Sequence, residues 1–84
     1  MYRLEVSHTA HQQIRRLQNQ TQERVNDAIA GLAENPRPPG NKKLAGREGY
    51  RIRVGDYRIL YLIDDEAKLV VVYRVMPREN VYRL

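Results

Sequence analysis

The chain has 84 residues, of which 15 are Lys or Arg and 10 are Asp or Glu, and its formal net charge is +5 at pH 7. This length predicts a single domain over residues 1–84, and the absence of cysteine excludes disulfide bonds and cysteine-ligated zinc. No apolar run approaches the roughly 18 residues of a membrane-spanning helix, and the N-terminus lacks the apolar segment of a signal peptide. We therefore expect a soluble protein of the cytoplasm.

The positive charge is concentrated in the second half of the chain. Residues 1–36 carry four basic and four acidic side chains, which leaves eleven basic and six acidic ones to residues 37–84. Such a one-sided excess favours an anionic partner, and nucleic acid is the commonest large polyanion. On charge alone, a basic surface that only keeps the protein soluble is an equally good explanation.

The N-terminal part predicts one strand and two helices. Residues 2–6 alternate apolar and polar side chains, as a half-buried strand does. A first helix is expected to begin at Ser7 or Thr9, either of which can cap it. A second helix within residues 21–35 has apolar residues at i, i+3, i+4 and i+7 from Val25, the pattern of an amphipathic helix.

A loop and three strands complete the prediction. Three prolines and three glycines within residues 36–49 exclude a regular element there, and Pro36 is expected to end the second helix. Gly55-Asp56 is a two-residue hairpin turn, and the strands are predicted over residues 50–54, 57–63 and 69–75. The fold class is α+β in the order β-α-α-β-β-β, with two helices packed on one face of a small, mainly antiparallel sheet.

The hairpin turn fixes which side chains meet. A two-residue turn places Arg53 opposite Arg58, and Ile52 opposite Ile59 on the alternate face. The apolar face, which also carries three tyrosines, must lie under the helices, so the other face presents three arginines. These are Arg51, Arg53 and Arg58.

The opposed arginines suggest an anion site. A like-charge pair directly across a hairpin is destabilising, and such a cost often marks a functional site. Guanidinium groups match phosphate in a bidentate manner. The alternative is a solvated polar face whose arginine stems lie over apolar neighbours.

Other residue types limit the chemistry. Arginine stays protonated and is a poor general base, so metal-free RNA cleavage on this face needs another group, for which tyrosine is the remaining candidate. His8 and His11 lie near the start of the first helix, where no third metal ligand is evident. We therefore expect surface or capping histidines and no metal site.

The second half of the chain resembles a known toxin family. Residues 41–83, above all "GYRIRVGDYRILY" and "VVVYRV", are similar to the RelE branch of the RelE/ParE toxin superfamily, whereas the N-terminal part agrees in layout only. The resemblance implies a toxin of a type II toxin–antitoxin system. RelE-like toxins cut mRNA in the ribosomal A site, without a metal or other cofactor, by attack of the ribose 2′-hydroxyl on the scissile phosphate.

The resemblance implies roles for five residues. Arg58 and Arg78 would hold the scissile phosphate and stabilise the phosphorane. Arg51 and Arg53 would bind the flanking backbone, and one of them would steady the leaving oxygen. Tyr82 would help to activate the 2′-hydroxyl or stack on a base, and its alternative is a C-terminal aromatic that simply packs.

Further contacts are expected with RNA and with a protein partner. Lys42, Lys43 and Arg47 would bind ribosomal or substrate RNA through charge alone. The resemblance also implies a RelB-like antitoxin in a hetero-oligomeric complex. An acidic, partly disordered segment would suit the basic face, and a helix could cover a groove between sheet and helices.

One departure from the family leaves the activity open. Where the family usually has Gly-His before the last arginine, this chain has Met76-Pro77. Proline transfers no proton, and methionine lacks the freedom of glycine at positive φ. Either Arg78 and Tyr82 suffice, or the site is weakened. The alternatives to an mRNA endonuclease are a non-enzymatic ParE-like toxin that binds DNA gyrase and a RelE-fold RNA-binding protein with weakened catalysis.

Overall fold

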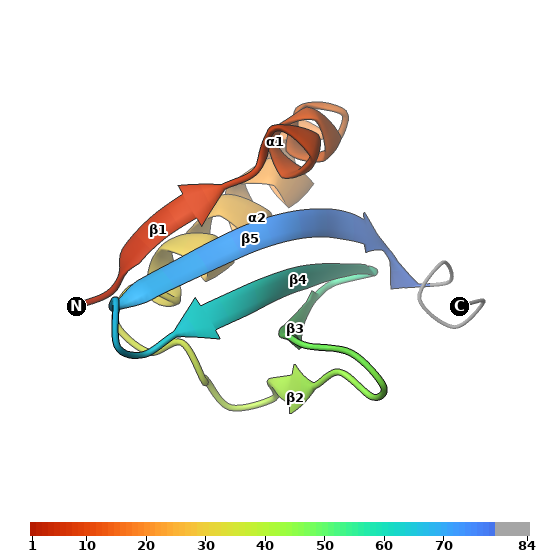
Figure 1. The fold of residues 1–84 in the computed structure, drawn as a ribbon. Helices are drawn as coiled ribbons and strands as arrows, with labels where there is room; N and C mark the ends of the chain where they lie inside the picture. The colour runs from red at the N-terminus through yellow and green to blue at the C-terminus, as the bar shows by residue number, and fades with distance from the viewer. Residues whose placement is uncertain (79–84) are drawn as a thin grey trace.

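The computed structural model describes residues 1–78 and shows two helices against one sheet (Figure 1). No helix in this part of the chain is long and apolar enough to span a membrane. The elements in chain order are β1 (Arg3–Val6), α1 (His8–Arg15), α2 (Asn19–Gly31), β2 (Lys42–Lys43), β3 (Tyr50–Val54), β4 (Tyr57–Asp64) and β5 (Leu69–Pro77). The predicted α+β fold class is confirmed. The prediction that residues 36–49 contain no regular element is wrong, because Lys42–Lys43, which lie between the prolines and the later glycines, pair with β3 as the short strand β2.

The sheet is mixed, and its strand order is β1-β5-β4-β3-β2. β1 pairs with β5 in parallel, whereas the other neighbours are antiparallel. Both helices cover the same face of the sheet (Figure 1). The sequence did not define the position of β1, because a parallel neighbour is reached only through the helical crossover and no turn fixes it.

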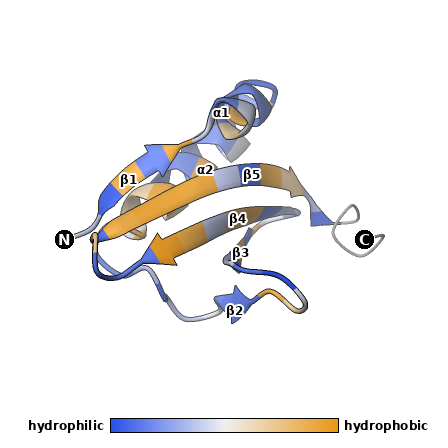
Figure 2. Ribbon diagram, viewed as in Figure 1, coloured by the Kyte–Doolittle hydropathy of each residue, from blue (hydrophilic) through white to orange (hydrophobic). Residues whose placement is uncertain are grey.

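The core lies between the helices and the face of the sheet that they cover. Hydrophobic residues fill the first half of β5 and the second half of β4 (Figure 2). Tyr61 is fully buried there, and Tyr50 and Tyr57 are partly buried against the same core, as predicted. The fully packed side chains come from both layers: Ala10, Ile14, Val25, Ile29 and Leu32 from the helical layer and Ile52, Ile59, Tyr61, Val70, Val72 and Val75 from the sheet.

The ends of the helices depend on local chemistry. Ser7 caps α1, since its Oγ accepts a hydrogen bond of 3.1 Å from the backbone N–H of Ala10. α2 ends at Gly31, so the prediction that Pro36 ends this helix is wrong. Glycine is a poor helix former, and Pro36 lies beyond the end of the helix, where its carbonyl accepts a 2.7 Å hydrogen bond from the hydroxyl of buried Tyr61.

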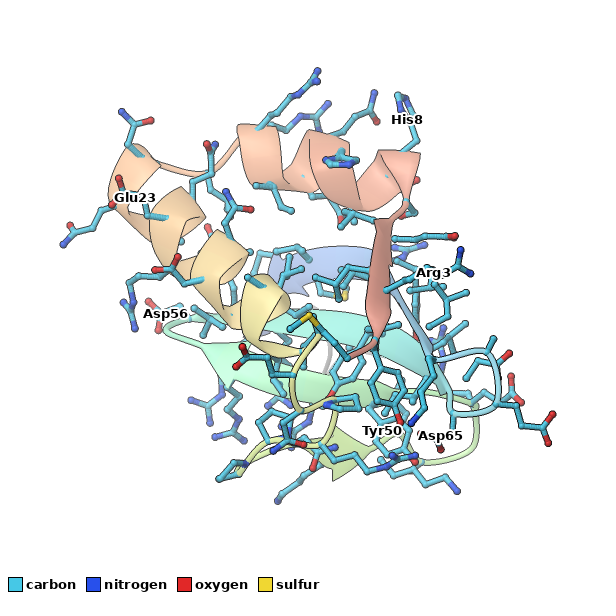
Figure 3. The ribbon with its side chains drawn as sticks, turned by 90° about the vertical axis from the view of Figure 1, so that its left-hand side faces the viewer. Arg3, His8, Glu23, Tyr50, Asp56 and Asp65 are labelled. Atoms are coloured by element: carbon cyan, nitrogen blue, oxygen red, sulfur yellow. The ribbon has the colours of Figure 1, made fainter. Side chains whose placement is uncertain are left out.

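A cluster around Asp65 ties the N-terminus and the loop after α2 to the β4–β5 turn. Its carboxylate pairs with Arg37 at 2.9 Å and accepts a 2.6 Å hydrogen bond from the hydroxyl of Tyr2. The hydrogen bonds from Arg37 and then Tyr2 lower the pKa of Asp65 to about 2. Arg37 also lies 5.3 Å from the ring centre of Tyr50, and Tyr50 and Asp65 lie at the same end of the sheet (Figure 3).

A β-bulge interrupts the pairing of β4 with β5. Leu60 lies opposite Arg74, but the next residue, Tyr61, lies opposite Val72, so Tyr73 is an extra residue in β5. The bulge shifts the alternation of β5 by one position. Consequently Val75, which is 3% exposed, returns to the core instead of Arg74.

Helix α1 satisfies the backbone groups that the bulge displaces. The Ser7 Oγ donates to the carbonyl of Tyr73 at 3.2 Å, and the backbone N–H of Val75 donates to the Oε1 of Gln13 at 2.7 Å. The backbone N–H of Ser7 also donates to the carbonyl of Val72 at 2.8 Å. Buried backbone groups are costly when unpaired, so α1 stabilises the bulge.

We predict that Gln13→Ala destabilises the protein by about 1–3 kcal/mol, because it leaves the backbone N–H of Val75 without its acceptor. Urea unfolding followed by circular dichroism measures this. Gln12→Ala, at the exposed neighbouring position of α1, is the matched control and should change stability by less than about 0.5 kcal/mol. Equal stabilities of the two variants would contradict the role assigned to Gln13.

Candidate nucleic-acid interface

The face of the sheet opposite the helices, here called the outer face, collects basic side chains at one end. Side chains that lie directly opposite each other in neighbouring strands share a face. Arg53 lies opposite Arg58, as predicted, and Arg51 lies opposite both Leu60 and Lys42. Leu60 in turn lies opposite Arg74. We call the resulting basic set the arginine face; it consists of Lys42, Arg51, Arg53, Arg58 and Arg74.

Arg58 occupies the centre of this set. It lies on β4 between Arg53 of β3 and Met76 of β5. It is 2% exposed and is the only buried charged residue in the described part of the chain, whereas Arg53 and Arg74 are exposed and Arg51 is half-buried. A phosphate therefore meets the outer arginines first and reaches Arg58 only where the surrounding side chains give way.

The outer face changes character along its length. At the end near the β3–β4 turn, its strand positions are basic or apolar. At the other end, Leu62 and Val71 contribute to a depression of about 730 Å³. Four acidic side chains also line it, which are Glu48, Asp64, Asp65 and Glu66. A polyanion is attracted to the first end and repelled from the second.

The structure brings a fourth arginine to the face that sequence reasoning missed. Strict alternation from Val70 and Val72 would have turned Arg74 toward the helices, and only the bulge at Tyr73 puts it beside Leu60. The sequence does contain a signal for the bulge. Buried valines should recur every second residue along a strand, but Val72 and Val75 are three residues apart.

Arg78 lies directly after β5, at the end of the sheet that holds Arg53 and Arg58. Its backbone N–H donates to the carbonyl of Asp56 in the β3–β4 turn at 2.9 Å. The backbone therefore places Arg78 near the arginine face. Tyr82, the fifth residue with a predicted role, lies outside the described residues.

The three residues predicted to bind RNA by charge occupy different places. Lys42 belongs to the arginine face, whereas Lys43 lies opposite Tyr50 and so turns to the other side of the sheet edge. The guanidinium of Arg47, in the loop before β3, lies 5.9 Å from the ring centre of Tyr73. The structure thus brings Lys42 and Arg47 to the outer face and separates Lys43 from them.

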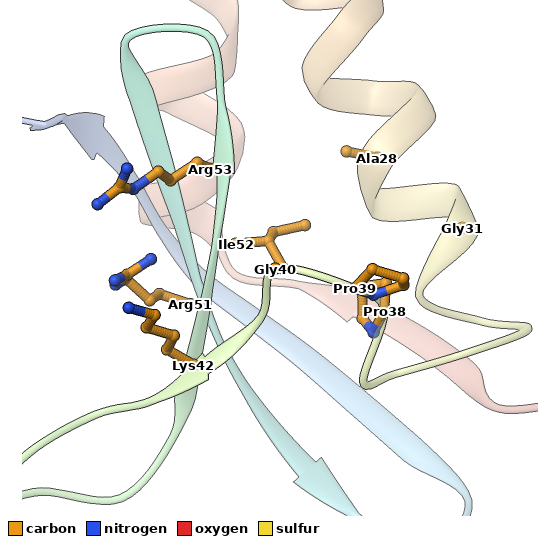
Figure 4. Close-up of a pocket in the computed structure, with 9 residues that line it drawn as sticks. All are labelled: Ala28, Gly31, Pro38, Pro39, Gly40, Lys42, Arg51, Ile52 and Arg53. Atoms are coloured by element: carbon orange, nitrogen blue, oxygen red, sulfur yellow. The ribbon is translucent and has the colours of Figure 1, made fainter.

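A groove runs beside the arginine face at the open edge of β3, where the pairing with β2 has ended. Its volume is about 530 Å³. Arg51, Arg53 and Lys42 point together to one side of β3, and Ile52 points to the other, toward α2 (Figure 4). The far wall comes from α2 and the proline-rich loop, through Ala28, Gly31, Pro38, Pro39 and Gly40. The predicted groove between sheet and helices is therefore present and has a basic rim.

The Met76-Pro77 departure causes no backbone strain. Among the described residues, Lys68 is the only non-glycine residue with positive φ, so position 76 does not require glycine. The concern that methionine cannot replace the conformational freedom of glycine there is not supported. Met76 is 8% exposed and lies opposite Arg58, where it provides an apolar neighbour.

The two histidines lie away from the arginine face, on the surface of α1, as expected. His8 and His11 are exposed on α1, and His8 points away from the sheet (Figure 3). Within residues 1–78, no three His, Asp or Glu side chains gather as metal ligands. A group other than these histidines would therefore have to transfer protons on the arginine face.

Comparison with known proteins identifies the family. A family model described as the ParE toxin of the type II toxin–antitoxin system parDE matches residues 4–82. The chain belongs to the RelE/ParE toxin superfamily. Toxin RelG of Mycobacterium tuberculosis is 40% identical over 62 residues, which cover 70% of this chain and 69% of RelG. The resemblance inferred from the sequence is thereby confirmed at the level of the superfamily.

Solved structures of RelE toxins share the fold. The archaeal RelE-RelB complex from Pyrococcus horikoshii contains a chain with a TM-score of 0.83 and 25% identity, covering 92% of this chain and 94% of that one. The RelBE2 complex of Mycobacterium tuberculosis gives a TM-score of 0.79 with 32% identity, covering 92% and 98%. The isolated E. coli RelE toxin gives 0.78 with 28% identity, covering 99% and 98%.

The arginine face predicts binding of small oxyanions by this RelE/ParE toxin. A ligand that binds only the folded state at ten times its Kd stabilises by about 1.4 kcal/mol, which raises the Tm of a small domain by roughly 5–10 °C. Phosphate should therefore raise the Tm more than chloride does at equal ionic strength. The excess should shrink in Arg53→Gln but persist in Arg16→Gln, an exposed arginine after α1. An equal excess in both variants would contradict the anion site.

Proposed function

We propose that the chain is the toxin of a type II toxin–antitoxin system and acts as a ribosome-dependent, metal-independent mRNA endonuclease in the cytoplasm. The observation that carries this proposal is the arginine face, with buried Arg58 at its centre and exposed arginines on both neighbouring strands. Family membership supports the toxin role, and the outer face supplies cationic donors that can bind a phosphate and stabilise charge that develops on it.

The reaction is a transesterification within the RNA. The 2′-hydroxyl oxygen attacks the adjacent phosphorus, its proton is removed, and the bond from phosphorus to the 5′-oxygen breaks as that oxygen gains a proton. The products are a 2′,3′-cyclic phosphate and a 5′-hydroxyl. Charge accumulates on the phosphorane oxygens, so preorganised cationic donors lower the barrier.

We assign the roles as the family resemblance implies. Arg58 and Arg78 hold the scissile phosphate. Arg51 and Arg53 bind the flanking backbone, and one of them steadies the leaving oxygen. Arginine cannot serve as the base, so activation of the 2′-hydroxyl is assigned to Tyr82, as the family resemblance implies. Positioning by the ribosome supplies the alignment that a small protein lacks.

RNA contacts beyond the scissile phosphate are assigned to the lysines and to Arg47. Lys42 extends the arginine face along β2, and Arg47 flanks it from the preceding loop. Lys43, on the other side of the sheet edge, would contact ribosomal RNA rather than the cleaved strand. Contacts of this kind act through charge and depend on salt.

An antitoxin is the second proposed partner. The solved RelE structures from Pyrococcus horikoshii and Mycobacterium tuberculosis are toxin–antitoxin complexes. In this chain, the groove of about 530 Å³ combines apolar walls with a basic rim. An acidic amphipathic segment would fit it and would neutralise Arg51 and Arg53 at the same time. Such binding would block RNA by occupying the arginine face.

The family model favours a second candidate function. Because the matching family is described as the ParE toxin, a non-enzymatic toxin that binds DNA gyrase is the alternative to an endonuclease. A RelE-fold RNA-binding protein with weakened catalysis is the third candidate, and the proline at position 77 is its main support.

Cleavage in a reconstituted bacterial translation system tests the proposal. Primer extension should show cuts in the translated mRNA only when ribosomes are present. Arg58→Ala should reduce the cleavage rate by about 10²–10³-fold, because it removes a donor to the developing charge. Arg53→Ala, at an exposed position, should also reduce the rate, and Arg16→Ala should not.

The outcomes separate the candidates. Cuts that are independent of ribosomes would overturn the ribosome requirement, and cuts that persist in Arg58→Ala would overturn the site. A folded wild-type protein that makes no cuts but inhibits gyrase supercoiling would establish the ParE-like alternative. RNA binding without cleavage and without gyrase inhibition would support the third candidate, a RelE-fold RNA-binding protein with weakened catalysis.

A further inference from the structure

We propose that a small cavity on the outer face, next to the arginine face, is a nucleobase subsite. The cavity has a volume of about 220 Å³ and is lined by Arg47, Leu60, Arg74 and Met76; we call it the base pocket. This inference rests on the proposed function and names which part of the RNA strand occupies which part of the face.

The pocket has an apolar floor and two cationic walls. Leu60 and Met76 are 4% and 8% exposed, so they form a firm floor. Arg47 and Arg74 stand at its sides as exposed guanidinium groups. A flat guanidinium stacks on aromatic rings and donates hydrogen bonds in its own plane.

This combination fits a base better than a phosphate or an aliphatic side chain. A phosphate would gain from the two arginines but would be desolvated against Leu60 and Met76. An aliphatic side chain would gain from the floor but would leave both guanidinium groups unused. A nucleobase uses both, because proteins bind single-stranded bases by stacking, including on arginine planes, and by hydrogen bonds to base edges.

The walls of the pocket are fixed by the fold. The bulge at Tyr73 puts Arg74 on the outer face, and α1 satisfies that bulge through Ser7 and Gln13. Arg47 lies over the ring of Tyr73 at 5.9 Å from its centre. A site whose walls are already held loses less entropy on binding.

Tyr73 is in turn held against Gly49. A Cβ at Gly49, where φ is +116°, would lie 3.3 Å from the Tyr73 hydroxyl and 3.0 Å from the carbonyl oxygen of Tyr61. The Tyr73 ring thus reaches from β5 across β4 to the start of β3.

The pocket lies at the right spacing from the phosphate site. Leu60 is two residues after Arg58 on the same face of β4, which corresponds to roughly 6.6–6.8 Å along a strand. Met76 lies directly opposite Arg58, and Leu60 directly opposite Arg51. A strand whose phosphate is held at Arg58 therefore brings the base of an adjoining nucleotide over Leu60 and Met76.

Abasic substitution in an uncleavable RNA tests the subsite. A short 2′-O-methyl oligoribonucleotide of mixed sequence is made with each position abasic in turn. The Kd of each version is measured by calorimetry. For the wild type, loss of one particular base should weaken binding roughly 5- to 150-fold, the usual range for a stacked base. In Arg74→Gln the same abasic change should cost less than about 2-fold, and Arg47→Gln should behave similarly.

Matched controls distinguish this from a general loss of charge. Arg16→Gln, beyond the sheet, should keep the full abasic penalty. Arg53→Gln should weaken binding of all oligonucleotides alike and also keep the penalty, because it contacts backbone. If Arg74→Gln does not fold, Arg47→Gln, in the loop before β3, carries the test.

The results separate failure of the subsite from failure of the proposed function. An abasic penalty that is equal in the wild type and both pocket variants at every position overturns the base pocket, and so does the absence of oligonucleotide binding. If the wild type cleaves mRNA in either case, the endonuclease proposal survives. A penalty that depends on Arg74 in a protein that makes no cuts supports the pocket and removes the endonuclease. Weaker antitoxin binding by Arg74→Gln with no change in the abasic penalty would assign the pocket to a protein partner instead.

Discussion

The register of β4 against its two neighbours decides which side chains meet on the outer face. On one side, the two-residue turn at Gly55-Asp56 sets Arg58 opposite Arg53. On the other side, the bulge at Tyr73 sets Leu60 opposite Arg74. A shift of one residue on either side would send these guanidinium groups to the helix-covered face. The proposed chemistry therefore depends on backbone pairing as much as on the arginines themselves.

The two faces of the sheet have opposite effects on the stability of the domain. The helix-covered face buries apolar side chains and supplies the stability, whereas the outer face concentrates like charges that oppose folding. Arg58 is the clearest case, because its cationic side chain is only 2% exposed in a domain of 84 residues. Burial of a charge opposes folding. α1 links the two faces. It lies on the covered face, and hydrogen bonds from Ser7 and to Gln13 stabilise the bulge that places Arg74 on the outer face.

Most of the fold and part of the site could be predicted from the sequence. The hairpin turn is a local signal, so the pairing of Arg53 with Arg58 was predicted correctly and the structure confirms it. The bulge is not local: it depends on Gln13, 62 positions from Val75 in the sequence. Arg74 was therefore missed, although the three-residue interval between Val72 and Val75 indicated that the alternation of β5 is interrupted. The parallel place of β1 was out of reach for the same reason, because no turn encodes it.

On the proposed function, RNA lies on the outer face, across Arg51, Arg53, Arg58 and Arg74. Nuclear magnetic resonance with an uncleavable 2′-O-methyl oligoribonucleotide tests it most directly, by following the arginine side-chain Nε–H signals and the backbone amides during a titration. We predict saturable shifts of these four arginines and of β3, β4 and β5 near the β3–β4 turn, with α1 and α2 little changed. Shifts concentrated on Arg15 and Arg16 or on the acidic end of the sheet, with the four arginines unmoved, would contradict it.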